Sequence, residues 1–171
     1  MSDKYLVVKN TTIEMMEDRG YSVIDSDDDN ILFENVDTAE RVLSCIFDEN
    51  KLNVNNIKDM INMLNENDIK HGIIIYNEVI TSTAKKIIDT LQDYDIEVFS
   101  INELKFNITK HRLVPKHIKI SGDELTEVRK FATKLPVMLK SDPVTRYYHY
   151  RPGDIIRVER LDKTIAYRLV K

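Results

Sequence analysis

The sequence has few of the residues that form covalent or metal cross-links, and it has no long apolar segment. Its single cysteine, Cys45, has no partner for an internal disulfide bond, which is typical of a reducing, intracellular compartment. No apolar run approaches the roughly 20 residues that span a bilayer, so no membrane partner is expected. The first ten residues contain only a short apolar run and do not resemble a signal peptide.

Metal and nucleotide sites also lack support. Zinc sites inside cells use paired ligands, but the sequence has no second cysteine and no two histidines three or four residues apart. The acidic run DSDDDN places Asp25, Asp27 and Asp29 at the first ligand positions of a calcium loop. Asn30 then stands where glycine is needed and Val36 where the bidentate glutamate is needed. No glycine-rich loop follows the apolar run GIIIY. We therefore expect a solvated acidic turn, no metal and no cofactor.

No group with the pattern of a catalytic residue stands out. Ser141, His149 and Asp154 are close in sequence, but Ser141 precedes a helix start and lacks the glycines of a nucleophile elbow. A nuclease needs clustered carboxylates and a lysine around a metal. The carboxylates of the first half are spread mostly over predicted helix faces, so no catalytic residue is expected. A nuclease built on this half remains an alternative, which a divalent-metal titration with a DNA cleavage assay would test.

What the sequence does contain is charge, and the two signs are unevenly distributed. Residues 1–110 have 22 Asp/Glu and 11 Lys/Arg, a net charge of −11. Residues 111–171 have 7 Asp/Glu and 14 Lys/Arg, a net charge of +7. Segments of opposite sign suggest two domains with different partners. The basic segment suits nucleic acid or an acidic protein surface, whereas the acidic segment would be repelled by phosphates.

The first part of the chain alternates predicted helices and strands. Apolar residues at helical spacing favour helices, and short continuous apolar runs favour buried strands. The strand–helix–strand order of residues 72–100 predicts a parallel pair, and residues 1–108 are expected to form a small α/β layer domain. The predicted helices are 1–19, closed by Gly20, 37–50, capped by Asp37 and Glu40, 55–67 and 81–94; the strands are 31–36, 72–76 and 96–100.

The second part has a different character and predicts a small α+β domain with a mixed sheet at residues 109–171. Pro115 interrupts the stretch HRLVPKH, which reads as an extended hinge before a short strand. His117 is expected to hydrogen-bond to backbone there. Further along the chain, the pattern predicts a capping box at Ser121 and Glu124, a helix start at Asp142 and Pro143, a turn at Pro152 and Gly153, and two strands at 154–160 and 164–170.

A set of arginines and tyrosines is the strongest functional signal of this part. Arginine and tyrosine are frequent at the energetic centres of protein interfaces, and they also contact phosphates and stack on bases. Arginines at alternating strand positions are expected to share one face. The alternative is that the tyrosines are core residues with a solvated hydroxyl. The set comprises Arg146, Arg151, Arg157, Arg160 and Arg168 with Tyr147, Tyr148, Tyr150 and Tyr167.

Four stretches of the second half carry a specific pattern: FNITKHRLVPKHIKI, LPVMLKSDPVTRYY, GDIIRVER and AYRLV. In this order they resemble the fifth subunit of eukaryotic DNA-directed RNA polymerases. The resemblance extends upstream through GIIIYNEVITSTAKKI and IEVFSINELKFNIT, so it covers about residues 71–171. The last third alone also resembles the archaeal counterpart of this polymerase subunit, whereas residues 1–70 resemble the family only in kind.

This resemblance implies an N-terminal jaw domain and a C-terminal assembly domain. In the family, the assembly domain anchors on the largest polymerase subunit, the jaw lies at the downstream end of the DNA cleft, and neither domain is catalytic. The implied partners are the largest subunit, other polymerase subunits and, weakly and only within the assembly, downstream duplex DNA. The implied interface residues are Pro115, His117, Asp142, Pro143, Val144, Arg146, Tyr147, Gly153, Arg160, Tyr167 and Arg168.

The chain departs from the family pattern at several points. Tyr148 and Tyr150 replace small or aliphatic residues, and both the loop LDKT and the predicted jaw are short. A compact jaw in an Asn-, Ile- and Lys-rich chain is consistent with a viral homologue. The expected location is the nucleus, or a cytoplasmic viral factory and virion. The alternative function is a free-standing basic nucleic-acid-binding transcription regulator, which should bind DNA better once residues 1–110 are deleted.

Overall fold

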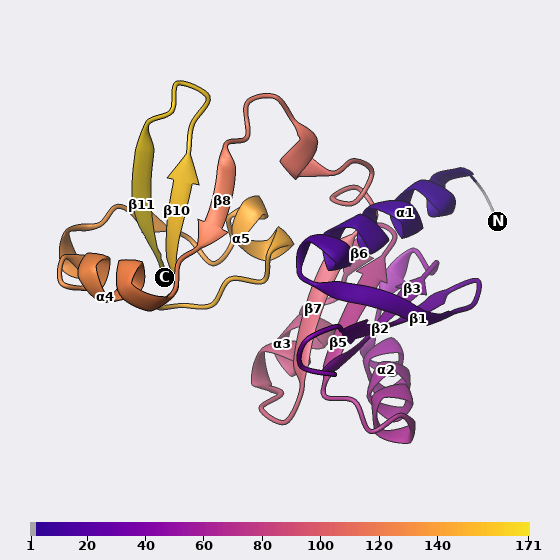
Figure 1. Ribbon diagram of the computed structural model, residues 1–171. Coiled ribbons are helices and arrows are strands. Elements are labelled where there is room, and N and C mark those ends of the chain that lie inside the picture. The colour runs from indigo at the N-terminus through magenta and orange to yellow at the C-terminus, as the bar shows by residue number, and fades with distance from the viewer. Residues whose placement is uncertain (1–2) are drawn as a thin grey trace. The chain divides into compact units, whose positions relative to one another are not determined.

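The computed structural model of the protein describes residues 3–171, which divide between Phe106 and Asn107 into two units (Figure 1). A five-stranded sheet belongs to the first unit and a four-stranded sheet to the second. Within the described part of the chain, no helix combines the length and the apolarity that crossing a bilayer requires.

The sheet of the first unit is mixed. β1, β2 and β3 pair antiparallel, because only short turns connect them, and parallel neighbours would need a long crossover. β3, β5 and β7 are parallel, which confirms the parallel pair predicted for residues 72–100. The fold is thus α+β, whereas the sequence pattern predicts a small α/β layer domain. In sheet order the strands are β1 (Tyr21–Ser26), β2 (Asn30–Asn35), β3 (Arg41–Phe47), β5 (His71–Tyr76) and β7 (Asp95–Ser100).

Three helices cover this sheet, with α1 on one side and α2 and α3 on the other (Figure 1). In α2, Asn53 and Asn56 each accept a hydrogen bond from the backbone N–H of the other, which forms a capping box. Ile57, Met60 and Leu64 then recur at helical spacing and belong to the core between α2 and the sheet. The helices are α1 (Asp3–Asp18), α2 (Val54–Glu66) and α3 (Ser82–Thr90), and two short strands, β4 (Lys51–Leu52) and β6 (Val79–Ile80), pair parallel.

The predicted helix at residues 37–50 is wrong, because this segment contains the strand β3. Residues 42–46 are all buried, as expected for a strand that lies between two neighbours and is covered on both faces. A continuous apolar run contains helical spacing as well as strand spacing, so periodicity alone does not separate the two. The predicted cap formed by Asp37 and Glu40 is wrong for the same reason.

The acidic turn predicted before the strand at residues 31–36 is confirmed, and it joins β1 to β2. The side chain of Asn30 donates to Asp27, and the backbone N–H groups of Asp29 and Asn30 also donate to this carboxylate. These hydrogen bonds lower the pKa of Asp27. Cys45 lies on the neighbouring strand β3, opposite Asn30, where burial raises the pKa of its thiol to about 12. A thiol with so little thiolate is a core residue and a poor nucleophile.

The second unit is a small α+β fold with a mixed sheet, as predicted. β8, β10 and β11 pair antiparallel, and β9 joins β11 in parallel at the far edge. The strands are β8 (Lys116–Lys119), β9 (Val137–Met138), β10 (Ile155–Glu159) and β11 (Ile165–Val170). The helices are α4 (Gly122–Arg129) and α5 (Pro143–Tyr147), with single 3-10 turns at η1 (Ile108–Lys110) and η2 (Ala132–Lys134).

Candidate subunit interface

The hinge motif leads directly into β8 and fixes the orientation of His117. The backbone N–H of Val114 donates to the carbonyl of His111, and that of Leu113 donates to His111 Nδ1. The carbonyl of Pro115 accepts a 2.7 Å hydrogen bond from His117 Nδ1. The predicted backbone contact of His117 is therefore confirmed. Since Nδ1 carries the donated hydrogen, Nε2 of the neutral ring is left as an acceptor.

The Asp-Pro step starts α5 as predicted. Pro143 occupies the first helical turn, where its missing N–H costs nothing, and Asp142 Oδ1 accepts from the backbone N–H of Val144 at 2.8 Å. Val144 is buried and belongs to the core of the unit together with Ile156 and Val158 of β10. The cap therefore holds Asp142 next to the apolar core.

The tyrosines at the end of α5 and directly after it pack on one another. Tyr147 is 4% exposed, and Asn107 Nδ2 donates to its hydroxyl at 2.9 Å. Its ring packs edge to face against the ring of Tyr148, with the ring centroids 5.0 Å apart. The rings of Tyr148 and Tyr150 are stacked, with their centroids 5.3 Å apart. The hydroxyl of Tyr150 donates to the backbone carbonyl of His117 at 3.2 Å. Of the two alternatives for the tyrosines, core packing therefore describes Tyr147.

The arginines of β10 and β11, together with Arg160 directly after β10, lie on both faces of the sheet, so the expectation of one arginine face is wrong. Arg157 and Arg160 are three residues apart, and an odd separation in a strand reverses the face. Arg157 is paired with Tyr167 across the strands, and both contact Glu124 of α4, Arg157 at 2.8 and 3.0 Å and Tyr167 at 2.8 Å. Arg160 and Arg168 share the other face.

Glu124 bonds to Arg157 and Tyr167 and does not form the capping box predicted with Ser121. Ser121 makes no side-chain cap hydrogen bond at the start of α4, so the capping prediction for this pair is wrong. The hydrogen bond from Tyr167 lowers the pKa of Glu124, and the hydrogen bond and charge of Arg157 act in the same direction. A side chain that bonds to the sheet is not free to reach back to the helix start, which explains the difference.

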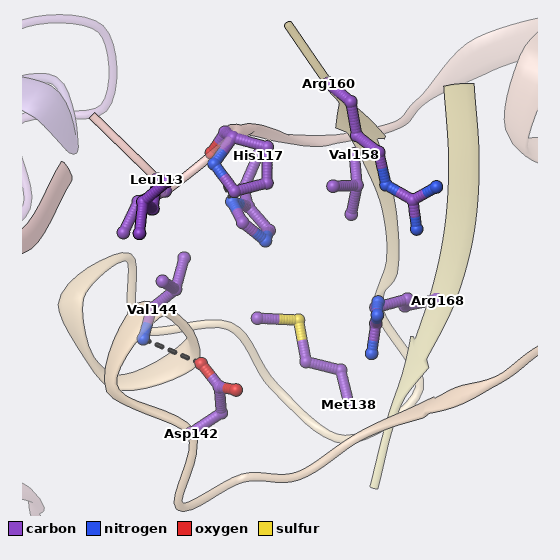
Figure 2. A pocket seen from close by; sticks show the side chains of 10 residues that line it. Leu113, His117, Met138, Asp142, Val144, Val158, Arg160 and Arg168 are labelled. Carbon is purple, nitrogen blue, oxygen red and sulfur yellow. Dashed lines mark hydrogen bonds between the residues drawn. The ribbon is translucent and has the colours of Figure 1, made fainter. Parts of the chain in front are cut away.

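One pocket brings six of the predicted interface residues together (Figure 2). Its volume is about 250 Å³. The six are Pro115, His117, Asp142, Val144, Arg160 and Arg168, and the other lining residues are Leu113, Val114, Met138 and Val158. Figure 2 shows the two arginines at one side and Asp142 at the other, with His117 between Leu113 and the arginines. The lining thus combines apolar side chains with two arginines, one carboxylate and one histidine.

The remaining predicted interface residues lie outside this pocket. Gly153 forms the predicted turn with φ +94°, a conformation that favours glycine, and its N–H donates to the carbonyl of Val170. The other four are Pro143, which begins α5, Arg146 on the same helix, Tyr147 in the core, and Tyr167 on the opposite sheet face.

The pocket changes the protonation of His117 in a direction that can be tested. Burial, together with the charge of Arg168, lowers the pKa of His117 in the folded protein. As the pH falls through about 6.5, the unfolded chain binds this proton first, so the second unit should lose stability from there downward. His117→Gln should flatten this loss. Hydrogen exchange of β8 and β10 between pH 8 and pH 5 measures it, and an equal pH dependence in both proteins would contradict the assignment.

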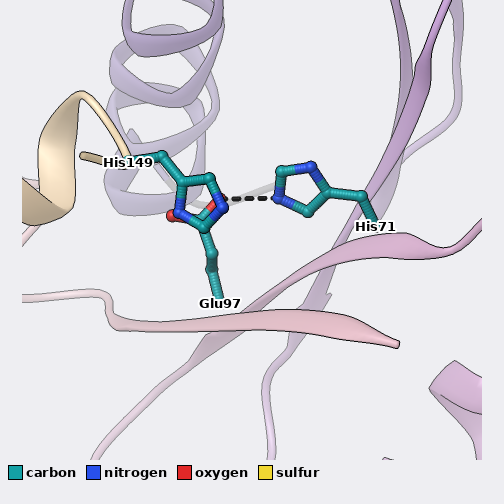
Figure 3. A group of neighbouring side chains, drawn as sticks. All are labelled: His71, Glu97 and His149. Atoms are coloured by element: carbon teal, nitrogen blue, oxygen red, sulfur yellow. Dashed lines mark hydrogen bonds and ion pairs between the residues drawn. The ribbon is translucent and has the colours of Figure 1, made fainter. Parts of the chain in front are cut away.

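In the first unit, a buried charge network that the sequence analysis missed joins α1 to β5 and β7. Both carboxylate oxygens of Glu97 accept from Arg19, at 2.7 and 2.9 Å. His71 Nε2 lies 2.8 Å from Glu97 Oε1 (Figure 3). The side chains of these three residues are 5–8% exposed. The one signal in the sequence was a carboxylate inside the apolar strand IEVFS.

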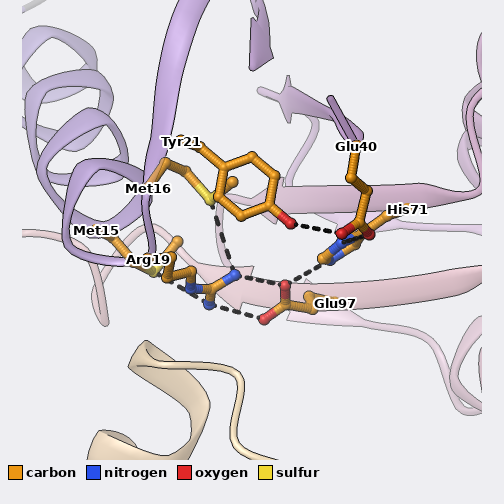
Figure 4. Close-up of polar contacts among 7 residues, drawn as sticks. All are labelled: Met15, Met16, Arg19, Tyr21, Glu40, His71 and Glu97. Carbon is orange, nitrogen blue, oxygen red and sulfur yellow. Dashed lines mark hydrogen bonds and ion pairs between the residues drawn. The ribbon is translucent and has the colours of Figure 1, made fainter. Parts of the chain in front are cut away.

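The half-buried Tyr21 and the exposed Glu40 extend this network at its edge (Figure 4). The Tyr21 hydroxyl donates to Glu40 Oε2 at 3.0 Å, and Glu40 Oε1 lies 3.8 Å from His71 Nδ1. Burial raises the pKa of Tyr21 to about 12, and the hydrogen bond to Glu40 contributes in the same direction. Arg19 and His71 both contact Glu97, so the network links the end of α1 and strand β5 to strand β7.

The chain is similar to known subunits of RNA polymerases. Residues 106–170 match the family model described as "RNA polymerase Rpb5, C-terminal domain". The chain is 27% identical to "DNA-directed RNA polymerases I, II, and III subunit RPABC1" of Caenorhabditis briggsae over a 197-residue alignment, which covers 95% of this chain and 93% of the relative. It is 28% identical to "DNA-directed RNA polymerase V subunit 5A" of Arabidopsis thaliana, over 99% of this chain and 89% of the relative.

A similarity to a solved structure is weaker. The structure titled "ATP-dependent Type ISP restriction-modification enzyme LlaBIII bound to DNA" aligns with a TM-score of 0.45 at 16% identity. The alignment covers 84% of this chain and 12% of that chain.

Proposed function

Since the chain belongs to the family of fifth subunits of DNA-directed RNA polymerases, we propose that it is a non-catalytic subunit of a multisubunit polymerase. The observation that carries the proposal is that the family match at residues 106–170 coincides with the second unit, where six of the predicted interface residues surround one pocket. The second unit, as an assembly domain, docks on the largest subunit. A standard interface buries about 800 Å² per partner, which a unit of this size can supply.

The first unit has the role of the jaw and lies beside downstream duplex DNA. Residues 1–110 carry a net charge of −11, so phosphates would repel the jaw if it were alone. The jaw is therefore held near DNA by the assembly and not by its own affinity. The protein acts where its polymerase acts, in the nucleus, or in a cytoplasmic viral factory and virion if the chain is viral.

Affinity purification of the tagged full-length chain from its native cells tests this function. The largest polymerase subunit and other polymerase subunits should co-purify, and mass spectrometry would identify them. The isolated chain should bind duplex DNA only weakly at physiological salt. Recovery of the chain without any polymerase subunit would overturn the proposal.

The alternative, a free-standing DNA-binding regulator, predicts a different pair of results. The purified chain alone would bind DNA tightly, and its affinity would fall steeply with salt. Two observations speak against it. Arg157 is engaged by Glu124, and the ring of Tyr147 is buried, so neither side chain is available to phosphates or bases without rearrangement.

A further inference from the structure

We propose that the pocket of the second unit, here called the arginine pocket, binds a carboxylate side chain of the largest polymerase subunit, with an apolar side chain next to it. The inference rests on the proposed function and identifies the chemistry of its contact. It follows from the charge, the size and the lining of the pocket.

The two arginines of the pocket lie at the same side of it and on the same face of the sheet. Arg160 is opposite Thr164 across the hairpin, and Arg168 follows on the same face of β11. The cross-strand pair between them, Val158 and Ala166, has short side chains that leave room above the sheet. Over residues 3–171, neither arginine forms an ion pair, whereas Arg157 on the opposite face is bonded to Glu124 and Glu159.

The other ionisable groups of the pocket leave this positive charge in place. His117 is neutral at physiological pH because burial lowers its pKa, and its Nε2 can accept a backbone N–H from the partner. Asp142 is the one carboxylate in the lining, and its Oδ1 is occupied by the N–H of Val144. A carboxylate from the partner fits the arginine side, because guanidinium groups bind carboxylates with two parallel hydrogen bonds.

The remaining lining favours a protein segment over a small molecule. A pocket of about 250 Å³ is smaller than the roughly 300–1,000 Å³ typical of small-molecule sites, and it suits single side chains. Leu113, at the rim, is 73% exposed, and Met138 and Val158 form an apolar wall. An apolar residue next to the partner's acidic residue would cover Leu113. Arginines desolvated in this way are common at the energetic centre of an interface.

Charge reversal in the full-length chain tests the pocket. In Arg160→Glu/Arg168→Glu, recovery of the largest subunit should fall below about one tenth of the wild-type level, because reversed charges face a buried carboxylate. The matched control Arg129→Glu/Lys134→Glu makes the same change of charge on α4 and η2 and should leave recovery within about twofold. Thermal unfolding of both variants verifies that they remain folded.

Carbodiimide cross-linking identifies the partner group independently. Arg160→Lys and Arg168→Lys keep the charge and place a primary amine in the pocket, and carbodiimide joins an amine to a carboxylate in contact with it. Mass spectrometry should find the new lysine linked to an Asp or Glu of the largest subunit, beside an apolar residue. Links confined to this chain, such as to Asp142, would overturn the inference.

The two proposals fail in different ways. If the wild-type chain retains the largest subunit and the charge-reversed variant does so equally well, the arginine pocket is not the contact, while the proposed function stands. If charge reversal instead abolishes DNA binding by the isolated chain and leaves the recovery of polymerase unchanged, the pocket binds phosphate and the inference is wrong. If the wild-type chain recovers no polymerase subunit, the proposed function fails and the inference fails with it.

Discussion

Replacing Glu97 by alanine should destabilise the first unit by about 3–5 kcal/mol. The substitution removes the carboxylate on which Arg19 and His71 converge, at distances of 2.7–2.9 Å, and Arg19 is only 5% exposed. Removing Glu97 takes away the carboxylate that Arg19 and His71 share, in surroundings that solvate charge poorly. The loss should therefore be far larger than the loss of one surface ion pair.

Glu34 provides the matched control. It is also a glutamate on a strand of the first sheet and pairs with an arginine, Arg41, at 2.9 Å, but the two side chains are 33% and 51% exposed. Glu34→Ala should cost about 0–1 kcal/mol, because water solvates the charge of Arg41 that remains in the variant. Equal losses in the two variants would show that the Glu97 network does not stabilise the unit.

The buried Cys45 offers a probe for this measurement that reports on the first unit alone. The chain has one cysteine, and its thiol is 2% exposed, so a thiol reagent should react only after the unit unfolds. Labelling across a urea series therefore gives the unfolding midpoint of the first unit without interference from the second. The Glu97→Ala midpoint should move to clearly lower urea than the Glu34→Ala midpoint.

Replacing Ile156 by alanine should destabilise the second unit by about 2–5 kcal/mol and with it reduce recovery of the polymerase. Ile156 is 0% exposed in β10, where it is paired with Lys119 on one side and Arg168 on the other. Its side chain packs with Val158 and Val170 in the core cluster of this unit. The truncation leaves a cavity in a small core, which has few contacts with which to compensate.

Ile165→Ala is the control, because it deletes the same atoms from the neighbouring strand β11 at a position that is 58% exposed. It should change the stability by less than about 0.5 kcal/mol. Hydrogen exchange of the backbone amides of β10 and β11 measures both variants in the second unit. Protection that is equally reduced, or equally unchanged, in the two would show that the core assignment of Ile156 is wrong.

Local signals in the sequence were sufficient for elements whose cause is local. α2 and α3 combine capping residues with apolar residues at helical spacing, and α5 follows an Asp-Pro step. The two long strands of the second unit alternate around a short polar loop. β3 is covered on both faces, so its apolar run is continuous and fits helical spacing as well as strand spacing. The sequence pattern therefore predicts a helix there, and it predicts neither β1 nor β9.

The sequence determined by itself the division of charge between the two halves, the capped helices, the turn at Gly153 and the polymerase-subunit family pattern. All of these depend on composition or on residues within a few positions of each other. Only the tertiary structure decided that Arg157 faces α4 while Arg160 and Arg168 share a pocket, and that Glu97 meets an arginine 78 residues away. The reason is that strand register and long-range pairing are set by burial across the whole fold, which no short segment encodes.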